Sequence, residues 1–160
     1  MSLRFHEIAE GDRRILNPTN EEKLTLVGRL CGLEENMRVL DLASGKGELL
    51  VQMAYHHGIR GVGVDISPVF VAAAQDRAYQ MDVGDKLNFV VGDAGLYPEP
   101  HHAFDVVACI GATWIGGGLA GTIDLMKTAL KSDGGLLLIG EPYWYAPAPL
   151  EVLDLLEIEP

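Results

Sequence analysis

Residues 39–50 read VLDLASGKGELL, and this stretch decides the fold. Its first half is an apolar run interrupted by Asp41, which is typical of a buried strand whose carboxyl end carries an acid. Gly45 and Gly47 follow, and they lack the Cβ atoms that would block a sharp turn or the close approach of a ligand. Glu48 then opens an apolar helical pattern. The stretch therefore predicts a strand, a glycine turn and a helix start, a combination typical of nucleotide-type ligand sites.

The same alternation of strand and helix continues along the chain. Apolar runs predict strands at residues 38–43, 59–65, 87–91, 104–110 and 136–139, and helical spacing predicts helices at 19–32, 48–57, 69–81 and 123–131. This order indicates an α/β fold with a doubly wound parallel sheet and right-handed crossovers, because connections of the other hand rarely pack back onto a sheet.

Composition divides the chain into three parts. Residues 1–20 are polar and are broken by Gly11 and Pro18, so we expect an irregular, flexible arm with one helical turn. Residues 21–141 form the ligand-binding domain, for which a hydrophobic content of 48% supplies an ample core. Residues 142–160 combine prolines and aromatic side chains with a short acidic helix at about 150–158, and we expect this tail to be truncated.

Charge and cysteine content narrow the class of protein. A net charge of −11 disfavours nucleic acids and anionic membranes as partners, because both attract basic surfaces. No apolar run reaches the ~20 residues of a membrane span, and we expect a cytoplasmic protein. Cys31 and Cys109 lie in apolar stretches without metal-type spacing, so we expect neither a disulfide framework nor a zinc site, and the apolar strand around Cys109 is typical of a core cysteine. Because the adjoining His101 and His102 are more typical of a solvated loop, we predict no metal site.

Three expected strands end in an acid, at Asp41, Asp65 and Asp93. The carboxyl ends of parallel strands meet at one edge of the sheet, where open α/β sheets bind ligands. Asp65 follows the glycine turn by about 20 residues, the spacing at which an acid accepts hydrogen bonds from the hydroxyls of an adenosine ribose. A dinucleotide fingerprint requires a glycine where this chain has Leu50, and Asp41 would repel a pyrophosphate. An adenosine ligand that carries an ammonium and a sulfonium fits better.

These residues resemble the motifs of the class I S-adenosylmethionine-dependent methyltransferases. The DxxxGxG motif of that family is matched by residues 41–47, DLASGKG, with Ala43 where many members have glycine. The resemblance covers residues 20–141 and includes GVGVDIS at 61–67, VVGDA at 90–94 and FDVV at 104–107. It implies a three-layer Rossmann-like fold with strand order 3-2-1-4-5 that lacks the last two strands of the family's sheet. The fifth strand would then have an open edge, through which we hypothesise a homodimer.

The resemblance also implies a cofactor site. S-adenosylmethionine would be the cofactor and S-adenosylhomocysteine its product. Asp41 and the glycine turn would contact the methionine part, Asp65 the ribose hydroxyls and Ile66 the adenine face. We expect Lys46 to be solvated, with only its backbone N–H near the ligand. Carried over position by position, the cofactor-binding residues are Asp41, Ala43, Ser44, Gly45, Gly47, Asp65, Ile66, Asp93, Ala94, Ile110, Gly111 and Ala112.

The reaction that the resemblance implies is an in-line displacement, in which a lone pair of the acceptor attacks the methyl group of the sulfonium. Alignment supplies much of the rate in such a reaction, so a base is needed only when the acceptor must lose a proton. Candidates for that base are Glu141, Tyr143, His6 and its neighbour Glu7.

The residues after the fourth expected strand bear on the acceptor. Family members that methylate adenine or glutamine amides have a proline-rich motif there, whereas this chain has GATW at 111–114. Together with the acidic charge, this difference favours a small-molecule acceptor. Residues 114–118 are compatible with a substrate lid and with a simple turn. Two other functions stay open: a non-catalytic module that binds S-adenosylmethionine, and an NAD-dependent oxidoreductase, which Leu50 and Asp41 disfavour.

Overall fold

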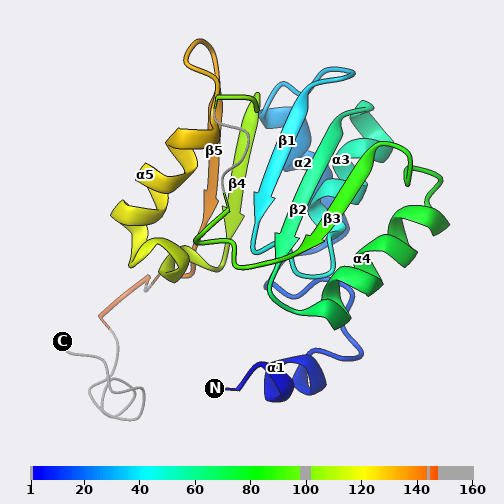
Figure 1. Ribbon diagram of the computed structural model, residues 1–160, viewed down its shortest axis with the longest axis vertical. Helices are drawn as coiled ribbons and strands as arrows, with labels where there is room; N and C mark the ends of the chain where they lie inside the picture. Colours follow the sequence, from blue (N-terminus) through cyan, green and yellow to red (C-terminus); the bar gives the residue numbers. More distant parts are fainter. Residues whose placement is uncertain (1, 98–101, 144, 148–160) are drawn as a thin grey trace.

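The computed structural model describes residues 2–97, 102–143 and 145–147, and it contains one five-stranded sheet (Figure 1). The strands are all parallel and lie in the order β3-β2-β1-β4-β5, as the sequence predicts. The acidic helix expected at 150–158 lies outside the described residues. The strands are β1 (Arg38–Leu42), β2 (Arg60–Asp65), β3 (Leu87–Val91), β4 (Val106–Ile110) and β5 (Leu136–Gly140). The helices are α1 (Leu3–Ala9), α2 (Glu21–Leu30), α3 (Glu48–His57), α4 (Pro68–Gln80), the 3₁₀ helix η1 (Thr113–Gly116) and α5 (Leu119–Ala129).

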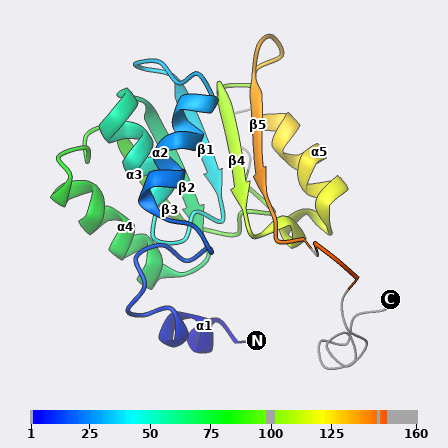
Figure 2. The ribbon, with the colours of Figure 1, turned by 180° about the vertical axis from the view of Figure 1, so that it is seen from behind.

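The sheet is the middle of three layers. Helices α2, α3 and α4 cover one face and α5 covers the other, as Figures 1 and 2 show from opposite sides. The central strand β1 is buried on both faces, so alternate residues enter two separate hydrophobic clusters. Val39 packs on the side of α3, whereas Leu40 and Leu42 pack on the side of α5. This packing explains why residues 39–42 read as a continuous apolar run instead of an alternating one.

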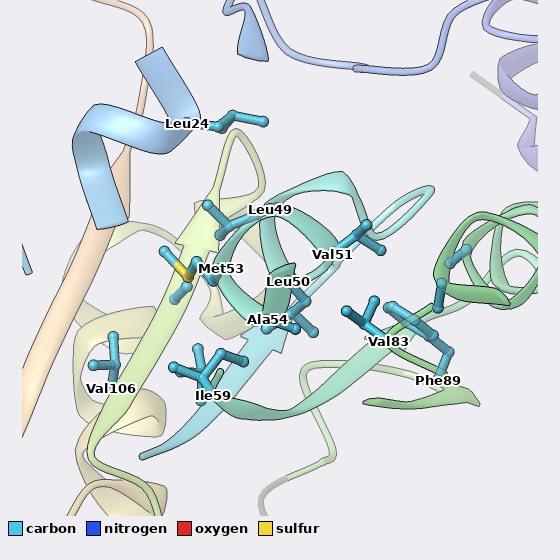
Figure 3. Packing of buried hydrophobic residues seen from close by; sticks show 14 of the residues in the cluster. Leu24, Leu49, Leu50, Val51, Met53, Ala54, Ile59, Val83, Phe89 and Val106 are labelled. Atoms are coloured by element: carbon cyan, nitrogen blue, oxygen red, sulfur yellow. The ribbon is translucent and has the colours of Figure 1, made fainter. Parts of the chain in front are cut away.

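Helix α3 fixes the turn that precedes it. Its residues Leu50 and Met53 are at most 1% exposed, and Figure 3 shows them beside Ile59, with Phe89 in the same cluster. Complete burial of a side chain of this size contributes ~1.5–3 kcal/mol, so the start of α3 is held firmly against the sheet. The carboxyl ends of the strands all point to the edge beside α1 (Figure 1). The glycine turn between β1 and α3 lies at this edge.

Helix α5 and strand β4 are among the elements that start at other residues than the sequence predicts. Helix α5 begins at Leu119, before the expected residue 123, because Thr122 is buried and its hydroxyl accepts from the Gly116 N–H and donates to the Thr113 carbonyl. These bonds close residues 113–118 into η1 and a tight turn, which favours the turn interpretation over a lid. Strand β4 begins at Val106, because Phe104 forms only an isolated bridge with Leu130.

The amino-terminal arm contains more helix than the sequence predicts. Helix α1 has seven residues where one turn is expected, and the hydroxyl of Ser2 caps it by accepting from the Phe5 N–H. Its side chains also bind the domain, because Glu7 accepts a hydrogen bond of 2.6 Å from the Ser67 hydroxyl. A helix this short needs such tertiary contacts, and no local sequence pattern reveals them.

Among the described residues, no helix combines the length and the apolar character that crossing a bilayer requires.

Candidate functional site

A cavity of about 580 Å³ opens at the carboxyl edge of the sheet, between the strand ends and the arm. Eleven of the twelve residues that the sequence predicts as cofactor-binding line this cavity. Gly47 is the exception, because it lies on the side of the turn that packs against α4 and β3. A Cβ atom on Gly47 would lie 2.5 Å from the Phe89 ring of β3. The residues brought together are Asp41, Ala43, Ser44, Gly45, Asp65, Ile66, Asp93, Ala94, Ile110, Gly111 and Ala112.

The turn between β1 and α3 has a left-handed backbone at three positions. Ala43, Gly45 and Gly47 have φ angles of 57°, 54° and 71°. Glycine adopts this conformation readily, whereas alanine loses roughly 1–2 kcal/mol in it. The positive φ of Ala43 gives a physical reason why many proteins with this motif have glycine at that position.

Asp41 is a buried acid that lines the cavity. It is 3% exposed, and burial, together with the charge of Asp65, raises its pKa to about 8. No hydrogen bond within the described residues counteracts this rise. A positive charge in the cavity would stabilise the ionised form of Asp41, whereas a negative charge would oppose it.

Asp65 holds the glycine turn in place. Its Oδ2 accepts a hydrogen bond of 2.8 Å from the Gly45 N–H, and its Oδ1 accepts one of 2.9 Å from the Ser67 N–H. The sequence does not predict this structural role. Each carboxylate oxygen retains a further lone pair, so the assignment of Asp65 to ribose hydroxyls stays a prediction.

Asp93 lies at the exposed rim of the cavity. Its Oδ1 accepts a hydrogen bond of 2.8 Å from the Gly95 N–H, which closes an ordinary turn after β3. The neighbouring Ala94 is 5% exposed and forms part of the cavity wall. Both the structural and the adenine-binding interpretations of Asp93 are therefore compatible with its position.

The arm forms the opposite wall of the cavity, which the sequence does not predict. Residues 14–17 line it, together with Leu3 and His6 of α1. The expectation that Lys46 is solvated is wrong, because its ammonium donates to the main-chain carbonyls of Glu10, Gly11 and Arg13. The residues at 10–17 show no periodic pattern, so only the fold reveals that they complete the site.

A buried acid links the arm to two helices. Glu48, at the start of α3, is 4% exposed and forms salt bridges with Arg14 at 2.9 Å and Arg77 at 3.1 Å. It also accepts a hydrogen bond of 2.7 Å from the Gln52 side chain. Arg14 continues the network to Glu21 on α2, and this ion pair lowers the pKa of Glu21. The pairing of Glu48 makes it a structural acid, although it also lines the cavity.

Of the candidate bases, the structure brings only His6 to the cavity. Its ring packs edge-on against Phe70, with 5.4 Å between the ring centroids. Glu7 is occupied by the hydroxyl of Ser67, and Glu141 accepts a hydrogen bond of 2.8 Å from the Thr113 N–H at the start of η1. Tyr143 is 82% exposed and is not among the lining residues.

Cys109 lies inside β4 and is fully buried, as the sequence predicts for a core cysteine. Burial, with smaller contributions from Asp41 and Glu141, raises the pKa of its thiol to about 12. A thiolate nucleophile at this position is therefore disfavoured. Within residues 2–97, 102–143 and 145–147, no group of three or more His, Cys, Asp or Glu side chains is arranged to hold a metal ion.

Comparison with known proteins identifies the family. A family model described as "Methyltransferase domain" matches residues 33–146. The crystal structure of a SAM-dependent methyltransferase from Geobacter sulfurreducens, in complex with S-adenosyl-L-homocysteine, superposes with a TM-score of 0.91 at 46% identity. The chain belongs to the class I S-adenosylmethionine-dependent methyltransferases. The chain is also 45% identical over 150 residues to the uncharacterized protein YjhP of Escherichia coli, and 41% identical over 93 residues to the 27-O-demethylrifamycin SV methyltransferase of Amycolatopsis mediterranei.

The chain spans only part of the length of these relatives. The superposition covers 98% of this chain and 63% of the Geobacter protein, and the alignment with YjhP covers 93% of this chain and 60% of that protein. With the rifamycin enzyme the shares are 56% and 34%. The family and the Rossmann-like fold that the sequence resemblance implies are thus both confirmed.

Proposed function

We propose that this chain binds S-adenosylmethionine in the cavity at the carboxyl edge of its sheet and transfers the methyl group to a small-molecule acceptor. The observation that carries the proposal is the buried carboxyl group of Asp41, which lines the cavity beside Asp65. A ligand with an ammonium and a sulfonium would stabilise the ionised form of Asp41, whereas a pyrophosphate would oppose it. The bound S-adenosyl-L-homocysteine in the Geobacter relative supports the same cofactor.

The shape and chemistry of the cavity fit the parts of this cofactor. The turn at Gly45 and the strand end at Gly111, both with left-handed φ, allow the main chain to approach a ligand closely. Ile66 lines the cavity with an apolar side chain that is 58% exposed. The flat face of an adenine ring requires an apolar contact of this kind. Asp65 offers its remaining lone pairs to the ribose hydroxyls.

When bound, the cofactor supplies an activated methyl group and a neutral leaving group. The chain would contribute position, because Ile110, Gly111 and Ala112 line the cavity and the resemblance to the family implies that they lie below the sulfonium. Orientation of this kind can supply ~7–11 kcal/mol of the barrier. His6 is the candidate that receives a proton from the acceptor, since it is the proposed base that lines the cavity.

A small molecule is the class of acceptor that the surface favours. The net charge of −11 opposes binding to a phosphate backbone. The name of the rifamycin relative gives a small molecule as its acceptor, which supports a small-molecule acceptor here. Trp114 and Ile115 are among the residues that line the cavity, so an acceptor with an apolar part fits it.

Isothermal titration calorimetry with S-adenosylhomocysteine tests the cofactor site directly. We expect saturable binding with a stoichiometry near one, and Asp93→Ala should weaken it less than Asp65→Ala. No heat of binding at millimolar ligand would refute the proposal.

A second candidate is a module that binds S-adenosylmethionine without transferring its methyl group. One observation favours it: among the described residues, Glu141 and Tyr143 do not line the cavity. It predicts binding of S-adenosylhomocysteine without consumption of S-adenosylmethionine across a panel of alcohols, phenols and amines. Mass spectrometry of the panel separates the two, because transfer adds a methyl group to one acceptor. An NAD-dependent oxidoreductase has no support from the family or the relatives.

A further inference from the structure

Lys46 stands between the two glycines of the turn, and its side chain reaches the arm. Its ammonium donates to the carbonyls of Glu10 at 2.7 Å, Gly11 at 2.8 Å and Arg13 at 2.5 Å. An ammonium group has three donors, so these three bonds use all of them. The nitrogen also lies 5.7 Å from the centroid of the Phe70 ring, within the range of a cation–π contact.

The three carbonyls belong to the end of α1 and the turn after it. Glu10 caps the carboxyl-terminal end of α1, which ends at Ala9, and its carbonyl also accepts a hydrogen bond of 3.1 Å from the Arg13 N–H. One side chain of the glycine turn therefore bonds to three main-chain carbonyls directly after the arm helix. Because the Lys46 side chain binds main-chain carbonyls of the arm, a change of side chain in the arm would hardly alter these bonds.

The segment that follows is pressed against the cavity. A Cβ atom on Gly45 would lie 2.7 Å from Leu16 Cδ1, and one on Gly111 would collide with the side-chain oxygen of Asn17. Asn17 also donates a hydrogen bond of 3.3 Å from its Nδ2 to the Ile110 carbonyl. Leu16 and Asn17 thus cover the two glycine positions that, under the proposed function, lie beside the methionine part and the sulfonium.

We propose that Lys46 is a positioning residue, which clamps residues 10–17 onto the glycine turn so that this segment forms a wall of the cofactor cavity. The cofactor part of this inference rests on the proposed function. Lys46 itself has no donor left for the ligand. Its effect on affinity is therefore transmitted through Leu16 and Asn17, and loss of the clamp opens the wall.

Lys46→Met tests the clamp, since methionine keeps an apolar stem and removes the three donors. Lys23→Met is the matched control, because Lys23 is an exposed lysine on α2. In the ligand-free proteins, we expect faster amide hydrogen exchange at residues 10–17 in Lys46→Met, with β1 and β2 unchanged to show that the fold is intact. The control should exchange like the wild type. Unchanged exchange at 10–17 in Lys46→Met would overturn the clamp.

Calorimetry with S-adenosylhomocysteine tests the link to the cofactor. We expect Lys46→Met to bind about tenfold more weakly or worse, which corresponds to the loss of an interaction of ~1.4 kcal/mol. Leu16→Ala should also weaken binding, and the double variant should lose less than the product of the two single effects, because both changes act on the same segment. Multiplicative effects would mean that Lys46 and Leu16 act independently and would overturn the proposal.

The two readouts separate this inference from the proposed function. If the wild type fails to bind S-adenosylhomocysteine, the proposed function and the cofactor part of the inference both fall. The exchange measurement needs no ligand, so it still decides whether Lys46 holds the segment. If the wild type binds and Lys46→Met binds equally well, the proposed function stands and the inference is overturned.

Discussion

Asp41 carries a carboxyl group into a place that is almost closed to water. Its pKa is about 8 in the folded protein, mainly because of burial and secondly because of Asp65, whereas the ordinary value is 3.8. Below about pH 4 the carboxyl group is protonated in the folded and the unfolded chain, so it does not affect stability. As the pH rises further, the unfolded chain releases its proton first. The free energy of unfolding therefore falls until about pH 8, where the folded protein releases the proton too.

Asp41→Asn should remove this dependence on pH. Relative to the variant, we expect the wild type to lose up to ~1.4 kcal/mol of unfolding free energy per pH unit between about pH 4 and about pH 8. Urea unfolding of both ligand-free proteins across this range measures the difference, and the comparison of slopes cancels any constant cost of the buried amide. Parallel curves for the two proteins would show that Asp41 titrates normally.

Asp65 has a double role that one substitution should expose. Asp65→Ala removes the acceptor of the Gly45 and Ser67 N–H groups and, under the proposed function, a charge-assisted bond to ribose worth ~1.5–3 kcal/mol. We expect S-adenosylhomocysteine to bind at least tenfold more weakly, as calorimetry would measure. Asp93→Ala is the comparison, because Asp93 is exposed and its hydrogen bond to Gly95 is local. Unchanged affinity of Asp65→Ala would refute the ribose assignment.

At the scale of elements, the glycine turn is constrained by α3, α4 and β3 behind it. Gly47 combines a φ of 71° with a position where a Cβ atom would lie 2.5 Å from the Phe89 ring and 2.8 Å from the Ala74 side chain. Gly32, after α2, has a similar φ of 62° but no atom within 4 Å of the same position. The two glycines therefore separate the cost of the backbone conformation from the cost of the clash.

Gly32→Ala should destabilise the protein by ~1–2 kcal/mol, since alanine is strained at positive φ. Gly47→Ala should add a further ~1–3 kcal/mol, because the methyl group overpacks the contact between α3, α4 and β3. Chemical denaturation of the three proteins gives both differences. Equal losses for the two variants would mean that the core yields to the methyl group at no cost.

The central elements could be predicted from the sequence because their causes are local. Val39 and Leu40 are buried on opposite faces of one strand, so the apolar run itself records that both faces are covered. The arm could not be predicted, because Lys46 binds carbonyls 33 to 36 residues away and Leu16 meets a glycine of the turn. Such contacts depend on the tertiary fold and leave no periodic signal. The structural role of Glu48 could not be predicted for the same reason, because its salt bridges join it to Arg14 and Arg77, which are distant in the sequence.

At the scale of the whole molecule, β5 forms one edge of the sheet. The Leu136 N–H donates to the Asp105 carbonyl, and the Gly140 carbonyl accepts from the Gly111 N–H, so these residues face β4. Alternation along the strand directs the N–H groups of Leu137 and Ile139 to the other side. Within the part of the chain that the structure describes, no strand pairs with that side. A row of unpaired donors and acceptors is a template for a second chain.

We therefore expect self-association through the outer side of β5. Leu136→Lys should shift the protein toward the monomer of 17.3 kDa, because a charge on the edge, at a side chain that is 40% exposed, opposes strand pairing. Leu26→Lys is the matched control, since Leu26 is an exposed leucine on α2. Size-exclusion chromatography with light scattering over a concentration series measures the mass. A wild type that stays monomeric at every concentration would contradict the expectation, and equal behaviour of the two variants would place any association on another surface.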